Sequence, residues 1–154
     1  MFIDYVRIHV KAGDGGNGCI SFRREKHVPR GGPNGGDGGD GGSIYLIGDP
    51  SLTTLLDLKI THFYKAKRGQ HGMGSNCSGK TGDDVRIHVP LGTVVTMDDD
   101  EVADIIHPGQ VFCAAKGGHG GRGNQHFATA SRHTPRYAEK GWPGEDRNLI
   151  LELK

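Results

Sequence analysis

Glycine that recurs with a period of three is the feature that most constrains how this chain can fold. The chain contains 27 glycines among 154 residues, more than twice the usual share of about 7%. They gather in four stretches, residues 13–18, 31–42, 69–82 and 117–123. Residues 35–42 read GGDGGDGG. Three residues per turn is the period of polyproline II, and glycine at a fixed place in each turn leaves a face without Cβ atoms. Extended segments with such a face can pack closely, so we expect the glycine stretches to bundle.

The alternative for these stretches is a flexible, disordered linker, which composition alone favours. Serine is scarce in them, however, and Pro, Asp, Asn and Arg occur at regular places. The stretches also lie between strand-like segments instead of at the chain ends. These observations favour ordered glycine segments.

The rest of the sequence has the pattern of short β-strands. Residues 6–10 and 85–89 both read VRIHV, and this alternation of apolar and polar residues is typical of a half-buried strand. Residues 98–101 predict a hairpin turn, and residues 52–58 predict one helical turn with Ser51 as its cap. Six further candidate strands are rich in Val, Ile, Thr, Tyr and Phe: residues 43–47, 61–65, 92–97, 101–106, 111–116 and 149–153.

Regularly spaced short strands predict an all-β fold, a small β-barrel or sandwich. We expect one domain over residues 1–154, in which the strands form a compact lobe. A glycine-rich lobe of packed polyproline II segments would be made mainly by residues 13–42, 69–82 and 117–136.

Composition and targeting signals narrow the class of protein. The formal net charge is only +1, so the distribution of charge matters more than its sum. Three scattered cysteines without a CxxC pair argue against a disulfide framework or a zinc site and fit a reducing compartment. Neither a signal peptide nor an apolar run of about 18 residues occurs. We expect a cytoplasmic monomer without a membrane span.

Two glycine motifs resemble nucleotide-binding loops. Residues 74–81 (GSNCSGKT) match the P-loop pattern, but no buried strand precedes them and no helix follows, as a P-loop requires. Residues 13–18 (GDGGNG) match G-x-G-x-x-G, yet only residues 19–28 precede Pro29, too few for the crossover helix of a dinucleotide fold. We predict no nucleotide-binding site in this chain.

The nine histidines show no spacing typical of metal ligands, and Gly-x-Ser-x-Gly is absent. We therefore predict neither a metal site nor catalytic residues, and the chain by itself is not expected to be an enzyme.

Basic residues concentrate beside the glycine stretches, whereas acidic residues gather elsewhere, notably at 98–101. Glycine lets backbone N–H groups approach a phosphate backbone, and Lys and Arg neutralise phosphates. The alternative, an ordinary solvated surface, stays open on spacing alone. The predicted RNA-contacting residues are Arg23, Arg24, Lys26, Arg30, Lys67, Arg68, Lys80 and Arg122.

Several of these residues lie in motifs that resemble the Obg family of GTPases. The motifs occur in order and at the expected spacing over essentially the whole chain: residues 22–39 (FRREKHVPRGGPNGGDGG), 74–80 (GSNCSGK), 89–93 (VPLGT), 120–124 (GGRGN) with Phe127 behind them, 141–145 (GWPGE) and 151–154 (LELK). This resemblance, more than periodicity, predicts that the glycine segments fold.

The resemblance implies that the chain corresponds to the amino-terminal domain of such a GTPase. A GTP-binding domain, with GTP and Mg²⁺ as its ligands, would follow Lys154, and GTP hydrolysis would reside there. In the family, the glycine-rich loops reach into the large (50S) ribosomal subunit near the peptidyl transferase centre, resemble a tRNA acceptor end, and act in assembly and stress control.

The expected partners are therefore large-subunit rRNA, possible ribosomal proteins and the protein's own GTPase domain. The alternative is a protein–protein interaction module of the same GTPase, which binds ribosomal or stress-response proteins.

Overall fold

Among the residues that the structure describes, eight β-strands make up most of the regular structure, and each overlaps a segment predicted from the sequence. The computed structural model describes residues 4–23, 31–129 and 134–154. The strands are β1 (Tyr5–Lys11), β2 (Ile44–Gly48), β3 (Phe63–Lys65), β4 (Val85–Val89), β5 (Thr93–Met97), β6 (Asp100–Ile105), β7 (Val111–Ala115) and β8 (Asp146–Leu153). The all-β class is confirmed.

The strands form two sheets that share one core. The larger sheet has the order β3-β1-β8-β5-β6 and the smaller one β4-β2-β7. Alternating residues of β1 and β8 point inward because side chains along a strand alternate between faces; Val6, Ile8 and Leu151 are at most 2% exposed. They pack with Ile44 and Leu46 of β2 in one hydrophobic cluster.

The predicted hairpin turn is confirmed. Asp98 and Asp99 join β5 to β6, and both have positive φ (51° and 67°). Positive φ at both central residues is the geometry of a two-residue hairpin turn, which Asp tolerates better than most residues.

The predicted helical turn is displaced, and Ser51 does not cap it. Helix α1 covers Leu56–Ile60 and has no side-chain cap. The Ser51 hydroxyl instead donates to Asp49 Oδ1 at 2.6 Å, and the Ser51 N–H donates to the same atom at 2.9 Å. This local turn competes with the helix, as short polar side chains often do. Among the described residues, no helix has the length and apolar character needed to cross a membrane.

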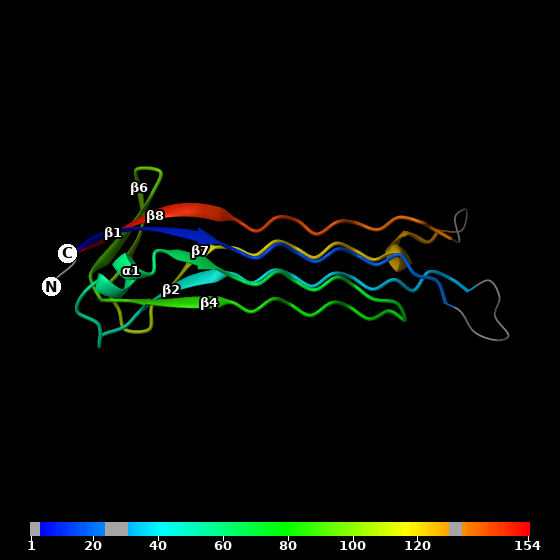
Figure 1. Ribbon diagram of the computed structural model, residues 1–154, viewed down its shortest axis with the longest axis horizontal. Helices are drawn as coiled ribbons and strands as arrows, with labels where there is room; N and C mark the ends of the chain where they lie inside the picture. Colours follow the sequence, from blue (N-terminus) through cyan, green and yellow to red (C-terminus); the bar gives the residue numbers. More distant parts are fainter. Residues whose placement is uncertain (1–3, 24–30, 130–133) are drawn as a thin grey trace.

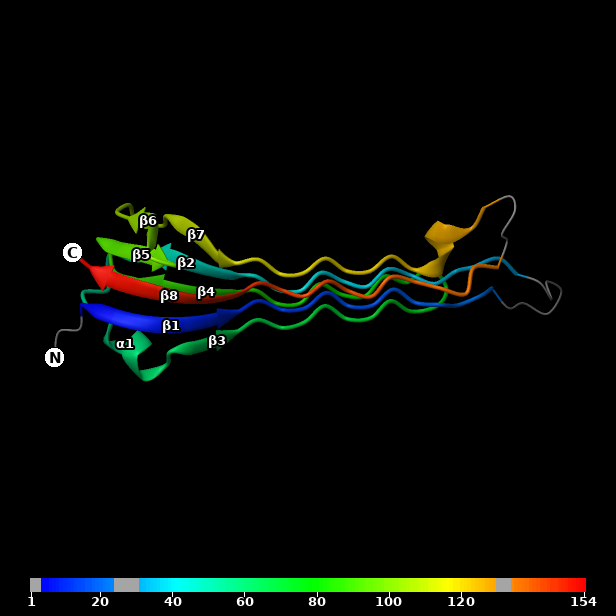
Figure 2. The same ribbon diagram turned by 90° about the horizontal axis from the view of Figure 1, so that it is seen from above.

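A long rod projects from the two sheets (Figure 1), and the orthogonal view in Figure 2 shows the same extension. Six extended segments form the rod, and each continues directly from one of the strands β1, β2, β3, β4, β7 or β8. The sheets therefore fix the order of the segments at the root of the rod. The six rod segments are residues 12–21, 33–42, 66–74, 77–84, 116–123 and 137–145.

Hydrogen bonds between rod segments repeat every three residues. The N–H groups of Gly13, Gly16 and Cys19 donate to the carbonyl groups of Gly42, Gly39 and Gly36, at 2.8–2.9 Å. The N–H groups of Gly15 and Gly18 donate to a different neighbour, the carbonyl groups of Trp142 and Glu139 in the sixth segment. Each segment thus bonds to different neighbours in successive positions, with the period that the glycine pattern predicts. The polyproline II conformation itself stays a prediction.

Glycine is required because the segments lie in backbone-to-backbone contact. A Cβ added to Gly38 would fall on the carbonyl oxygen of Gly16, and one added to Gly120 would fall on that of Gly38. Backbone atoms of neighbouring segments cannot move aside as a flexible side chain could. The rod is thus held by main-chain packing in place of a side-chain core.

The Asp and Asn residues of the repeats also have a structural role. Asp14 and Asn17, three residues apart, accept the N–H groups of Gly144 and Gly141, each at 2.9 Å. Asp37 and Asp40, again three apart, accept those of Gly123 and Gly120, at 2.9 and 2.8 Å. These side chains satisfy backbone donors that no neighbouring carbonyl reaches. The Gly-Gly-Asp repeat therefore specifies both the close packing of the rod segments and the hydrogen bonds between them.

Candidate nucleic-acid interface

The rod distributes the predicted RNA-contacting residues along its length. Lys67 and Arg68 follow β3 at the root, and Lys80 lies about midway, where its carbonyl accepts the N–H of Gln70. Arg122 and Arg23 lie towards the distal end, which we define as residues 19–23, 31–36, 73–77, 122–129 and 134–139. All five side chains are exposed. Arg24, Lys26 and Arg30 lie outside the described residues.

These cations do not converge on one point. The segments that carry Lys67, Arg68 and Lys80 bond to each other and to residues 12–21 and 33–42. Arg122 lies beyond those two central segments, on the flank made by residues 116–123 and 137–145. Lys67, Arg68 and Lys80 therefore lie on one flank of the rod and Arg122 on another.

Arg122 ties the fifth rod segment to the sixth. Its Nε donates to Glu139 Oε1 at 2.9 Å, and its main-chain N–H donates to the same oxygen at 3.1 Å. The Arg122 guanidinium and this N–H hold the pKa of the Glu139 carboxyl below its usual range. Part of the Arg122 charge is thus compensated, and its role includes stabilising the rod.

Aromatic rings accompany the guanidinium groups at the distal end. The Arg122 guanidinium carbon lies 5.3 Å from the centroid of the Phe127 ring, which in turn is 4.8 Å from the ring of Tyr137. The Arg136 guanidinium carbon lies 5.3 Å from the centroid of the Phe22 ring. Tyr137 is 45% exposed. Planar guanidinium groups and aromatic faces are the groups that stack on unpaired bases and contact phosphates.

Asn124, which the sequence does not single out as a site residue, holds the distal end together. It is fully buried in the 3-10 turn η1 (Asn124–Phe127). Its Oδ1 accepts the N–H of Gly35 at 2.8 Å, and its Nδ2 donates to the carbonyl groups of Ser21 and Pro135 at 3.0 Å. One amide therefore connects segments more than 80 residues apart. The GGRGN motif is the only sequence signal for it.

The P-loop-like motif has a different structure from a phosphate-binding loop. Ser75 and Asn76 have positive φ (58° and 56°) and form a tight turn between the third and fourth rod segments. Gly79 and Lys80 continue as an extended segment into β4. Gly79 packs against the carbonyl of Gln70, where a Cβ would overlap. The spacing of glycines here serves the rod.

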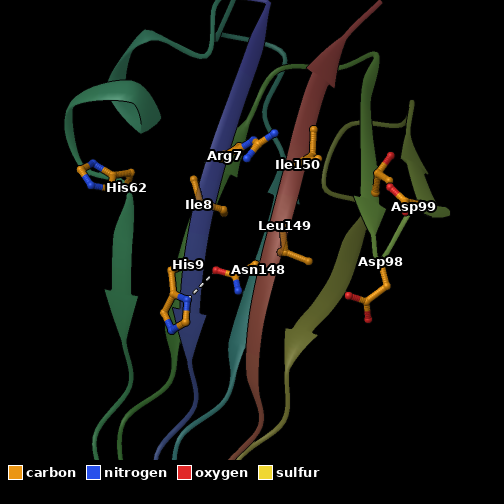
Figure 3. Close-up of a pocket in the computed structure, with 10 residues that line it drawn as sticks. Arg7, Ile8, His9, His62, Asp98, Asp99, Asn148, Leu149 and Ile150 are labelled. Atoms are coloured by element: carbon orange, nitrogen blue, oxygen red, sulfur yellow. Dashed lines mark hydrogen bonds between the residues drawn. The ribbon is translucent and has the colours of Figure 1, made fainter.

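A groove of about 540 Å³ crosses the outer face of the larger sheet, where Figure 3 shows its lining. His9 is held in place by Asn148 (2.7 Å) and Asp146 (2.6 Å) and stacks on Phe63. In Figure 3, Ile150 lies between Arg7 and the Asp98–Asp99 turn. In the described part of the chain, no group of three His, Cys, Asp or Glu side chains is placed to hold a metal ion.

Comparison with known proteins identifies the family of the chain. The family described as GTP1/OBG matches residues 3–154. A protein named GTPase Obg from Chloroherpeton thalassium is 56% identical over 156 residues, which cover all of this chain and 47% of that protein. The GTPase Obg proteins of Chlorobaculum tepidum and Myxococcus xanthus are 58% and 54% identical over 99% of this chain, and the match covers 46% and 32% of their lengths. The chain thus spans about half or less of the curated relatives that it matches. With this match over nearly its whole length, the chain belongs to the GTP1/OBG family.

Proposed function

We propose that this chain is the RNA-docking domain of an Obg-type GTPase, and that it inserts the distal end of its rod into the RNA of the large ribosomal subunit. The observation that supports this most directly is the pairing of guanidinium groups with aromatic rings at the end of a rod built from packed main chains. Folded RNA is recognised mainly by shape and through splayed bases. A stiff, narrow projection with stacking groups at its end is suited to that task.

The proposal divides the work between two parts of the longer protein. The relatives are named GTPases, and GTP binding and hydrolysis with Mg²⁺ belong to the part that this chain does not cover. The role of the present chain is to bind and orient on RNA during large-subunit assembly and its control under stress. The nucleotide state of the other part then regulates docking.

Cosedimentation with purified ribosomal subunits across a salt series tests this proposal. The chain should pellet with large subunits and not with small ones, and the affinity should fall as salt rises because bound phosphates release counterions. The double variant Arg23→Glu/Lys80→Glu should lose most of the bound fraction.

The matched control is Arg86→Glu, which reverses an exposed arginine of β4 at the sheet end of the molecule. It should pellet like the parent chain, and the melting temperature of each variant checks that it is folded. Unchanged pelleting of the double variant would contradict RNA docking. Binding that is insensitive to salt and survives removal of RNA would contradict it too, and would favour the protein-interaction module.

A further inference from the structure

Four cationic residues are among those that line a groove of about 490 Å³ where the rod leaves the sheets. Its walls are residues 11–14, which begin at the last residue of β1, and residues 65–68, which begin at the last residue of β3. The cations are Lys11, Lys65, Lys67 and Arg68, and Asp14 is the only carboxylate in the lining. This volume lies within the range of about 300–1,000 Å³ that is usual for ligand sites.

The fold forces two of these lysines together. Strands β1 and β3 are parallel, and their register places Lys11 directly beside Lys65. Like charges in opposite positions of neighbouring strands are destabilising. Gly13, which packs against the carbonyl of Lys67 where a Cβ would overlap, brings the two walls close at the next level of the rod. A concentration of charge that the fold does not relieve is typical of a binding site.

Carboxylates neutralise only part of this charge. Asp14 Oδ1 accepts from Lys11 Nζ at 3.2 Å, and it also accepts the N–H of Gly144 at 2.9 Å. Lys67 is 4.0 Å from Asp83, and both side chains are more than 70% exposed, so this pair is weak. Lys65 makes no ion pair with any residue that the structure describes. Four cations against one lining carboxylate leave a formal excess of three positive charges.

We propose that this groove is a phosphate-binding site, which we call the root site (Lys11, Asp14, Lys65, Lys67 and Arg68). Lysine ammonium groups act as point charges for phosphate oxygens and a guanidinium can donate to two of them. The phosphate groups can come from an RNA strand that runs along the rod or from a free polyphosphate. The RNA source rests on the proposed function; phosphate binding itself does not.

In the RNA case, the root site gives the rod a second anchor away from its distal end. Simultaneous contacts at the two ends would fix how deep the rod enters, whereas distal contacts alone would leave depth to the shape of the cavity. Contacts made within one complex reinforce each other because the second is intramolecular.

Titration with inorganic triphosphate, followed by NMR of the backbone amides, tests the site without RNA. Amides of residues 12–14 and 65–68 should shift saturably, and those of the distal end should not. Lys65→Gln removes a charge without breaking an ion pair of the described structure, and the double variant Lys11→Gln/Lys65→Gln should bind about tenfold more weakly or worse. Lys140→Gln, an exposed lysine of the opposite flank, is the matched control and should bind like the parent.

A second titration, with single-stranded RNA that has a 5′-hydroxyl, identifies the source. Displacement of triphosphate from the root site by this RNA would support the backbone as ligand. Triphosphate binding without displacement would support a free anion and overturn the RNA source. Absent root-site shifts, or shifts unchanged in Lys11→Gln/Lys65→Gln, would overturn the site altogether, whatever the outcome of cosedimentation.

Discussion

The α-carbon of Gly38 faces the carbonyl oxygen of Gly16 so closely that a single added methyl group would overlap with it. The two residues belong to neighbouring rod segments, and the N–H of Gly16 donates to Gly39 at 2.8 Å at the same level. Contact between main chains, without side chains between them, is therefore what holds the rod.

Replacing Gly38 by alanine should destabilise the protein strongly, because the new Cβ meets backbone that cannot rotate away. Overpacking of this kind costs about 1–3 kcal/mol or more, and we expect the upper part of that range in the free energy of unfolding, measured by urea denaturation. Gly32→Ala is the control, since nothing lies within 4 Å of a Cβ built there. Equal stability of the two variants would show that the segments are not in contact.

Truncating Asn124 should loosen the distal end while leaving the sheets intact. Asn124→Ala leaves the N–H of Gly35 and two carbonyl groups without their partner, and each unsatisfied buried group costs about 1–3 kcal/mol. Faster amide exchange should appear in residues 19–23 and 33–36, together with weaker binding to large subunits although no charge has changed. Gln125→Ala, in the same 3-10 turn, should leave both properties as they are.

The rod should lose stability in acid. Asp14 has a lowered pKa, mainly because it accepts the N–H of Gly144, and Glu145 has one mainly because it accepts the N–H of Lys116. A carboxyl with a lower pKa in the folded than in the unfolded chain stabilises the fold above its unfolded pKa. That contribution is lost as pH falls from about 4 through the folded pKa. The melting temperature should thus be flat from neutral pH to about 5 and drop below about 4. Asp14→Asn should flatten part of that drop, and an acid profile identical to the parent's would refute the role of Asp14.

Lys80 should contribute one phosphate contact to RNA binding. It is exposed, and its side chain forms no ion pair within the part of the chain that the structure describes. Lys80→Gln should weaken binding to different RNA sequences about equally and reduce the slope of log K against log salt by about 1. Filter binding at several salt concentrations measures this slope. A change in sequence preference with an unchanged slope would mean that Lys80 contacts a base edge.

The strands were predictable from the sequence because alternation in segments such as 6–10 and 85–89 reports directly which residues face the core. Which rod segments lie next to each other could not be predicted in the same way. A period of three predicts that Gly38 packs against something, but not that the partner is Gly16, since many registers share that period. The sixth rod segment, residues 137–145, is not recognisable as glycine-rich because its only glycines are Gly141 and Gly144.

The candidate site was predictable only in part, for a similar reason. Basic residues near glycine stretches could be identified, yet their distribution over two flanks depends on which segments bond to each other. Lys11 could not be identified from the sequence as part of a basic site, because only the parallel pairing of β1 with β3 places it beside Lys65. The prediction that Ser51 caps the helical turn was wrong, because the Ser51 hydroxyl donates instead to Asp49, two residues earlier.

Amide hydrogen exchange across the rod tests the central claim most directly. If glycine segments stack into a stiff rod, the N–H groups of Gly16, Gly38 and Gly121, which all donate to main-chain carbonyl groups, should be protected to a degree comparable with those of β1 and β8. Exchange of these three amides at the rate of an unfolded chain, while the sheets stay protected, would show that the segments are mobile tethers and would contradict the account.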